Sequence, residues 1–189
     1  MTESLKLHTL VCSTRPGRLG LGVGQWFHGL AAEHGSFQAE LVDLAAFDLP
    51  VFDEPHYPIL NRYEHGHTKR LSGTLKEADA FVFVAPEYNS GPSPALVNAL
   101  SYLAAEWHYK PAAFVTYGAG AGGSLGAGMV KPILTALRMM PIPECVSVPM
   151  IWNQLSDGVF QASDQNRSAA ATLLAELHRW AGALKPLRG

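Results

Sequence analysis

The feature that most constrains this chain is an unbroken apolar run at residues 81–85, with the sequence Phe-Val-Phe-Val-Ala. Strands with one wet face alternate apolar and polar residues, whereas strands covered on both faces read as continuous apolar runs. Strands of the second kind belong to parallel sheets that carry helices on both faces. The run therefore predicts a central strand of an α/β sheet.

The rest of the chain alternates between strand and helix patterns, as βα units do. Pro149 suggests that the last strand lies at an edge of the sheet, because proline cannot donate to the ladder. Besides the apolar run, strands are expected over residues 5–12, 37–44, 112–117 and 144–151.

The helix after the apolar run is the best marked. Ser93 can cap its start, Pro94 suits its first turn, and apolar residues recur at helical spacing as far as Trp107. We expect Trp107 to lie in the core. Lys110 is expected to complement the C-terminus of this same helix.

The 189 residues are too few for two typical domains, so we expect a single domain over residues 1–189. Five strands with intervening helices favour a flavodoxin-like three-layer sandwich, an α/β fold with its parallel strands in the order 2-1-3-4-5. Ligands of such sheets bind outside the carboxyl ends of strands one and three. The loops after Cys12 and Pro86 are therefore the expected site.

The loop at residues 13–20 reads Ser-Thr-Arg-Pro-Gly-Arg-Leu-Gly and leads into a helix. Backbone amides, the helix dipole and charge-assisted bonds from Arg15 and Arg18 can meet a phosphate there. A solvated turn with surface arginines is the plainer alternative. The position of the loop in the topology favours phosphate binding.

Two further loops follow the third and fourth strands. Residues 86–92, Pro-Glu-Tyr-Asn-Ser-Gly-Pro, could present amides and an aromatic face to a flat ligand, or could form an ordinary strand-to-helix turn. Residues 118–123, Gly-Ala-Gly-Ala-Gly-Gly, allow the backbone to approach a ligand closely.

The glycine-rich stretch also matches two motifs of other protein classes. Residues 118–123 fit the dinucleotide fingerprint, which belongs after a first strand rather than a fourth. Residues 122–126, Gly-Gly-Ser-Leu-Gly, fit the nucleophile elbow of serine hydrolases, with Asp157 and His178 following in the right order. A hydrolase would leave the other loops without a role.

Residues 47–67 contain three prolines that interrupt the segment, and they show no periodicity. A loop of this length in a compact domain is usually functional or an interface. Tyr57, Ile59, Leu60 and Tyr63 have no clear core role, so we expect this segment to make subunit contacts in a homo-oligomer, at least a dimer.

Charge and composition exclude several kinds of partner. The formal net charge of −2 gives no pull toward nucleic acid or an anionic membrane, and the apolar runs are too short to span a bilayer. Cys12 and Cys145 lack a C-x-x-C spacing, which fits a reducing compartment and a cytoplasmic location. His65 and His67 have no carboxylate cluster nearby, so we expect surface histidines and no metal site.

Taken together, the loops resemble the NADPH-dependent FMN reductase family over roughly residues 8–151. Val97 and Ser101 depart from the Lys and Asp that are usual in the family, and Cys12 stands where many members have Gly. The blocks that carry the resemblance are Ser13-x-Arg15-x-Gly17-Arg18, Tyr63-x-His65-x-His67-Thr68, Ala78-Asp79-Ala80 leading into Pro86-Glu87-Tyr88-Asn89, Asn98-Ala99-Leu100, Glu106-Trp107-x-x-Lys110-Pro111 and Tyr117-Gly118 through Gly122-Gly123.

The resemblance implies FMN as the cofactor and NADPH or NADH as the electron donor. The phosphate would be held by Ser13, Arg15, Arg18 and the backbone of Leu19 and Gly20. The isoalloxazine ring would be lined by Pro86, Glu87, Tyr88, Asn89 and Ser90, and its pyrimidine edge would be bordered by Tyr117, Gly118, Gly122 and Gly123.

The expected protein is an NAD(P)H-dependent reductase that passes electrons through FMN to a small acceptor. The acceptor would be a quinone, a free flavin, an azo compound or a metal oxyanion. No proton donor stands out, and Tyr88 and Glu87 are the candidates. The alternatives are a non-catalytic flavin-binding electron carrier or redox sensor, and a serine hydrolase.

Overall fold

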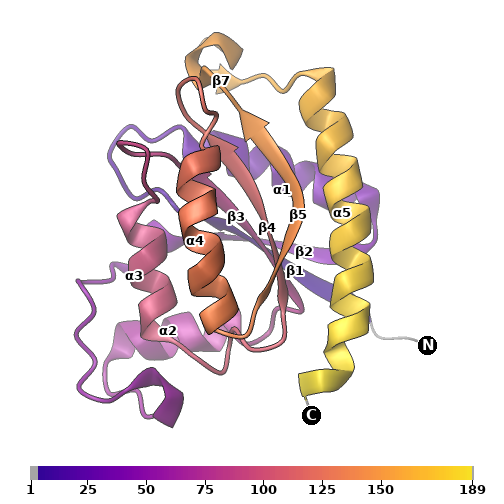
Figure 1. The fold of residues 1–189 in the computed structure, drawn as a ribbon. Coiled ribbons are helices and arrows are strands. Elements are labelled where there is room, and N and C mark those ends of the chain that lie inside the picture. The colour runs from indigo at the N-terminus through magenta and orange to yellow at the C-terminus, as the bar shows by residue number, and fades with distance from the viewer. Residues whose placement is uncertain (1–3, 189) are drawn as a thin grey trace.

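The computed structural model describes residues 4–188. Its centre is a five-stranded parallel sheet with the order β2-β1-β3-β4-β5, and helices cover both faces (Figure 1). The predicted flavodoxin-like order is therefore confirmed. The strands are β1 (Leu5–Val11), β2 (Phe37–Asp43), β3 (Ala80–Pro86), β4 (Pro111–Tyr117) and β5 (Met140–Val148).

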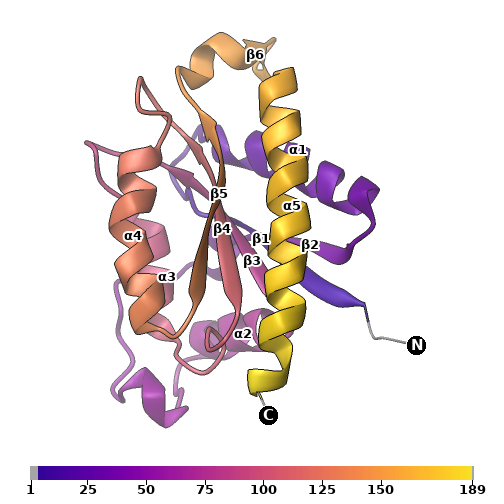
Figure 2. The same ribbon diagram turned by 45° about the vertical axis from the view of Figure 1, so that its right-hand side comes forward.

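Two helices cover one face of the sheet, and three cover the other (Figure 2). The first pair is α1 (Gly20–His34) and α5 (Asp164–Leu184), and the second group is α2 (Gly66–Leu75), α3 (Pro94–Tyr102) and α4 (Ser124–Ala136). Within residues 4–188, no helix is long and apolar enough to cross a membrane. The shorter elements are η1 (Leu44–Phe47), η2 (Pro58–Leu60), η3 (Ile151–Gln154), η4 (Lys185–Arg188) and a ribbon of β6 (Leu155–Ser156) and β7 (Val159–Phe160).

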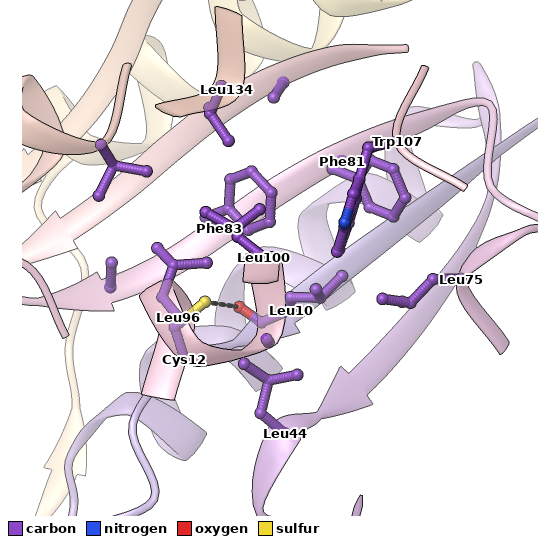
Figure 3. Close-up of a cluster of buried hydrophobic side chains, with 14 of the residues drawn as sticks. Leu10, Cys12, Leu44, Leu75, Phe81, Phe83, Leu96, Leu100, Trp107 and Leu134 are labelled. Carbon is purple, nitrogen blue, oxygen red and sulfur yellow. Dashed lines mark hydrogen bonds between the residues drawn. The ribbon is translucent and has the colours of Figure 1, made fainter. Parts of the chain in front are cut away.

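Strand β3 lies in the middle of the sheet and contributes to two cores. Phe81 and Phe83 belong to the core beneath α2, α3 and α4, where the rings of Phe81 and Trp107 have their centroids 5.0 Å apart (Figure 3). Val82 and Val84 belong to the core beneath α1 and α5. All of these side chains are fully buried. The apolar run is thus covered on both faces, as predicted, and Trp107 is a core residue.

The third helix is shorter than the sequence suggested. It ends at Tyr102, and Leu103 is already extended, so Trp107 reaches the core from the turn that follows. Lys110 complements a different helix, because its Nζ donates to the carbonyl oxygens of Leu75 (3.2 Å) and Lys76 (3.0 Å) at the end of α2. The prediction that Lys110 complements its own helix is therefore wrong.

Strand β5 lies at an edge of the sheet, as predicted, but it begins at Met140 and ends at Val148. Pro141 and Pro143 obscured its start in the sequence. An edge strand tolerates such prolines, because one side of its ladder has no partner. The pairing with β4 is irregular between Ala112 and Phe114, close to these prolines.

Candidate functional site

The predicted ligand loops meet at the carboxyl edge of the sheet, because β1, β3 and β4 are parallel neighbours (Figure 1). The order of the strands reverses between β1 and β3, which is the switch point of this topology. We call residues 12–19 the first loop, residues 87–93 the second loop and residues 118–123 the third loop.

The first loop leads into α1, which begins without a side-chain cap. The amides of its first turn can therefore serve an anion, and the helix dipole favours negative charge at this end. Gly17 makes the turn with a positive φ of 68°. Arg15 is exposed on the same loop and has no ion pair within the described chain. An uncapped helix start beside an unpaired guanidinium suits an anionic group.

Arg18 is bonded within the protein instead. One guanidinium nitrogen donates to the Ser13 carbonyl oxygen at 2.9 Å, and another pairs with the Asp43 carboxylate. Asp43 also accepts the amide of Ala45 at 3.1 Å. Arg18 thus ties the first loop to the end of β2, and its charge is partly neutralised there.

The second loop forms a small hairpin. Tyr88 and Gly91 exchange backbone hydrogen bonds of 3.1 and 2.9 Å. Between them, Asn89 and Ser90 have positive φ values of 50° and 60°, as a type I′ turn requires. The turn is fixed by its own backbone, so it can present Tyr88 in a constant position.

Hydroxyl groups join the first and second loops. The oxygens of Ser13 and Tyr88 lie 2.9 Å apart, and the Ser93 hydroxyl donates to the Cys12 carbonyl oxygen. Ser93 precedes α3, but its side chain makes no cap, so the predicted capping bond is wrong. Ser13 is only 1% exposed, so a ligand would have to replace Tyr88 to reach its hydroxyl.

The third loop depends on glycine at two positions. Gly122 and Gly123 have φ values of 60° and 87°. A Cβ would lie 2.2 Å from Ser147 Oγ at the first position and 2.6 Å from Thr116 Cβ at the second. The hydroxyls of Thr116 (2.6 Å) and Ser147 (3.1 Å) donate to the Gly122 carbonyl oxygen. The loop is therefore held against the end of the sheet.

Glu87 and Tyr117 lie at this edge in roles that the sequence did not indicate. The Glu87 carboxylate accepts the amides of Leu125 (3.0 Å) and Gly126 (3.4 Å), so it caps α4. The Tyr117 hydroxyl reaches the first loop, where a Cβ on Gly20 would lie 2.4 Å from it. Burial raises the pKa of Tyr117, so this buried hydroxyl stays protonated.

Three residues that fix the loops were not identified from the sequence: Asp43, Thr116 and Ser147. Asp43 ends the second strand, beside β1 in the predicted order, so its charge and position together could have indicated a role. Thr116 and Ser147 bond to a backbone carbonyl whose orientation depends on the fold. No sequence signal indicates that contact.

The described residues form neither a hydrolase triad around Ser124 nor a metal site at His65 and His67. The Ser124 hydroxyl donates to the Ala121 carbonyl oxygen at 2.8 Å, while His178 packs on Phe37 at the opposite edge of the sheet. His65 and His67 stack with centroids 5.2 Å apart beside Asp53. Across residues 4–188, no three His, Cys, Asp or Glu residues are grouped to hold a metal ion.

The fold and these loops define a flavodoxin-like protein with a ligand site at its switch point. A sequence model of the NADPH-dependent FMN reductase family matches residues 5–153. An NAD(P)H-dependent FMN reductase of Nectria sp is 30% identical over 177 residues, with 88% of each chain covered. Another from Schizosaccharomyces pombe is 34% identical over 156 residues, covering 82% of this chain and 78% of that one.

Solved structures support the fold. FerB, an NAD(P)H:(acceptor) oxidoreductase from Paracoccus denitrificans, superposes with a TM-score of 0.72 at 20% identity and covers 95% of this chain and 98% of its own. The chain belongs to the NADPH-dependent FMN reductase family. It is thus an oxidoreductase with FMN as cofactor and a reduced nicotinamide nucleotide as donor, and the sequence predictions of family, enzyme class and cofactor are confirmed.

The residues at the switch point fit FMN. The uncapped start of α1 and the unpaired Arg15 suit the phosphate. Gly122 and Gly123 let the third loop lie close against the sheet, because a Cβ at either position would meet Ser147 or Thr116. Tyr88 stands on the rigid hairpin between these two regions.

Proposed function

We propose that this reductase passes electrons from NADPH or NADH to a small acceptor such as a quinone, a free flavin, an azo compound or a metal oxyanion. FMN, when bound, supplies the redox chemistry, so the protein needs no acid–base pair of its own. The observation that carries the proposal is the junction of three hydrogen-bonded loops at the switch point, beside an uncapped helix start.

The first loop would hold the phosphate. Arg15 supplies an unpaired charge, and the backbone of Leu19 and Gly20 supplies amides at the start of α1. Arg18 orients the loop through Asp43, and its guanidinium would add positive charge on the same loop. Ser13 would exchange its Tyr88 partner for a phosphate oxygen.

The other two loops would hold the ring. Pro86, Glu87, Tyr88, Asn89 and Ser90 lie along one side, and Gly118, Gly122 and Gly123 lie along the other. Backbone amides that point toward a ligand stabilise negative charge that develops there. The work of the protein in this proposal is therefore positioning and electrostatics.

Turnover tests the proposal against its alternative, an electron carrier or redox sensor. FMN-loaded protein should oxidise NADPH or NADH continuously when a quinone is added, with the rate followed by the loss of nicotinamide absorbance. The acceptors should be compared in the same assay. A single rapid reduction without turnover would support a carrier or sensor, and colourless protein that does not quench FMN fluorescence would contradict the site.

We propose that the protein is a homodimer or homotetramer. Residues 51–60 support this, because Val51, Tyr57 and Ile59 are 88%, 80% and 65% exposed. Val97 and Ser101, which depart from the family pattern, line a groove of about 730 Å³ between α3 and residues 44–52. Exposed apolar side chains gathered on one segment are typical of subunit contacts.

We also propose a cytoplasmic location. Cys12 and Cys145 are both free thiols. Burial raises the pKa of Cys12, so that thiol is unreactive, while Cys145 is exposed. An exposed free thiol persists most readily in a reducing compartment.

A further inference from the structure

Glu87 belongs to the second loop, but its side chain bonds to α4, the helix that follows the third loop. One carboxylate oxygen accepts the amides of Leu125 at 3.0 Å and Gly126 at 3.4 Å, in the first turn of α4. The N-cap position of α4 is Gly123, which has no side chain and a φ of 87°. Glu87 therefore supplies from across the site the cap that Gly123 cannot provide.

Further contacts hold the same elements together. The Glu87 amide donates to the Tyr117 carbonyl oxygen at 3.2 Å. A Cβ on Gly126 would lie 2.8 Å from the Gly91 carbonyl oxygen, so the first turn of α4 packs directly on the second loop. A Cβ on Gly118 would lie 3.4 Å from Glu87 Cβ. The second loop, the third loop and α4 are thus in contact at several points around Glu87.

A carboxylate in this position is badly placed to donate a proton. Its bonded oxygen already accepts two amide hydrogens, and the N-terminal end of α4 attracts negative charge. The geometry therefore favours a structural task over the proton-donor role considered from the sequence.

We propose that Glu87 is a positioning residue that joins the second and third loops into one platform for the flavin ring. The proposal rests on the proposed function for the identity of the ligand. The joint, by which we mean the hydrogen bonds from the amides of Leu125 and Gly126 to Glu87, rests on the structure alone. By capping α4, the carboxylate sets the spacing of the two loops. The affinity for the ring then depends on that spacing.

Two substitutions and two probes test this. Glu87→Ala removes the acceptor, and Glu87→Gln keeps one oxygen acceptor without the charge. Lumiflavin reports on the ring alone, and inorganic phosphate reports on the first loop alone. Glu87→Ala should weaken lumiflavin binding by roughly fivefold to tenfold, the equivalent of one lost cap, and Glu87→Gln should stay within about threefold of wild type. The stabilisation by phosphate should be equal in all three proteins.

The pH dependence of kcat/KM separates positioning from proton donation. If Glu87 positions the loops, the profile of the FMN-loaded Glu87→Gln enzyme keeps the shape of the wild type. A general acid would lose one limb of that profile, and this result would overturn the proposal. So would a Glu87→Ala protein that binds lumiflavin as tightly as the wild type.

Amide hydrogen exchange in the ligand-free protein tests the joint without any flavin. The amides of Leu125 and Gly126 should exchange faster in Glu87→Ala and at the wild-type rate in Glu87→Gln and in the control Glu33→Ala, a substitution on α1. Unchanged exchange in Glu87→Ala would refute the cap. If the wild type binds no flavin, the proposed function fails, and the exchange experiment still decides whether the joint exists.

Discussion

Arg15 and Arg18 stand on the same loop, but their charges have different environments. Arg18 is bonded to Asp43 and to the Ser13 carbonyl oxygen, whereas Arg15 is exposed and has no ion pair in the described chain. Loss of Arg18 would therefore disturb the loop itself. Arg15 is the better probe of ligand binding, because its side chain contributes little to the folded protein.

We expect Arg15→Ala to weaken FMN binding by roughly tenfold to hundredfold, since a charge-assisted hydrogen bond is worth about 1.5–3 kcal/mol. The thermal stability of the ligand-free protein should not change. Fluorescence titration with FMN measures the affinity, and Arg62→Ala, in an exposed loop elsewhere, is the control. Equal FMN affinity in Arg15→Ala and wild type would remove Arg15 from the phosphate site.

Tyr117 allows a prediction about stability. Its hydroxyl is buried and makes no hydrogen bond of good geometry, although Ser13 lies close enough to affect its pKa. An unpaired buried hydroxyl is costly, so Tyr117→Phe should leave the free energy of unfolding of the ligand-free protein unchanged or raise it by up to about 1 kcal/mol. Urea denaturation measures this.

Tyr102→Phe is the matched control for Tyr117→Phe. The Tyr102 hydroxyl donates to an Asp53 carboxylate oxygen at 2.9 Å and also contacts the Pro50 carbonyl oxygen at 3.1 Å. Its loss should therefore destabilise the protein by about 1 kcal/mol. A comparable loss in Tyr117→Phe would mean that the Tyr117 hydroxyl has a partner in solution.

At the scale of elements, several helix ends in this protein are completed by side chains from outside the helix, whereas α5 begins with a local capping box of Ser163 and Asn166. Glu87 caps the start of α4, and Glu54 accepts the amides of Glu64 (2.8 Å) and His65 (3.0 Å) at the start of α2. Lys110 closes the end of α2. Local capping rules, which look for Ser, Thr, Asp or Asn beside the helix, cannot detect such contacts.

Lys110 gives α2 a pH-dependent component of stability. Burial lowers the pKa of its amine to about 8, below its value in an unfolded chain. Above this pH the unfolded chain holds a proton that the folded chain has released, so the free energy of unfolding rises with pH. Between about pH 7 and pH 9.5, stability relative to Lys110→Met should rise by up to about 2 kcal/mol.

The comparison with Lys110→Met isolates this component. Cys12 and the buried tyrosines Tyr102 and Tyr117 have raised pKa values, so they lower stability as pH increases above about 8.5 for the thiol and about 10 for the tyrosines. They are present in both proteins, and their contributions cancel in the difference. A difference in unfolding free energy that stays flat from neutral to alkaline pH would show that Lys110 keeps an ordinary pKa in the fold.

The elements that the sequence predicted well are those whose signal is local. The run at residues 81–85 carries its own evidence of burial, and Gly122 and Gly123 mark a backbone with positive φ and no room for a Cβ. The ends of α3 and β5 were misplaced because tertiary contacts decide them. Trp107 has helical spacing from Leu103 but reaches the core after the helix has ended.

The same distinction holds for the site. Strand order alone brought the first, second and third loops to one edge, so the predicted residues are neighbours in the structure. Their individual tasks were not predictable from the sequence. Glu87 and Arg18 are both bonded within the protein, and each bond joins segments that are distant in sequence.

At the scale of the whole molecule, several apolar side chains of residues 51–60 are exposed, although Phe52 packs on Tyr102 with ring centroids 5.2 Å apart. Val51, Tyr57 and Ile59 are largely exposed, and Val51 lines the same groove as Val97 and Ser101. Asn98 keeps this segment against α3, because its amide donates to the Pro50 carbonyl oxygen at 2.6 Å and accepts the Phe52 amide at 2.9 Å. The start of this segment is therefore held in place, which suits a subunit interface.

We expect light scattering coupled to gel filtration to give a mass of two or four chains of 20.4 kDa. Ile59→Glu combined with Val51→Glu should shift the protein toward the monomer, because an unpaired carboxylate buried at an interface loses its hydration. Thr172→Glu, on the exposed face of α5, should leave the mass unchanged. A wild-type monomer at micromolar concentration would contradict the proposed assembly. A double variant that stays fully associated would place the interface on another surface.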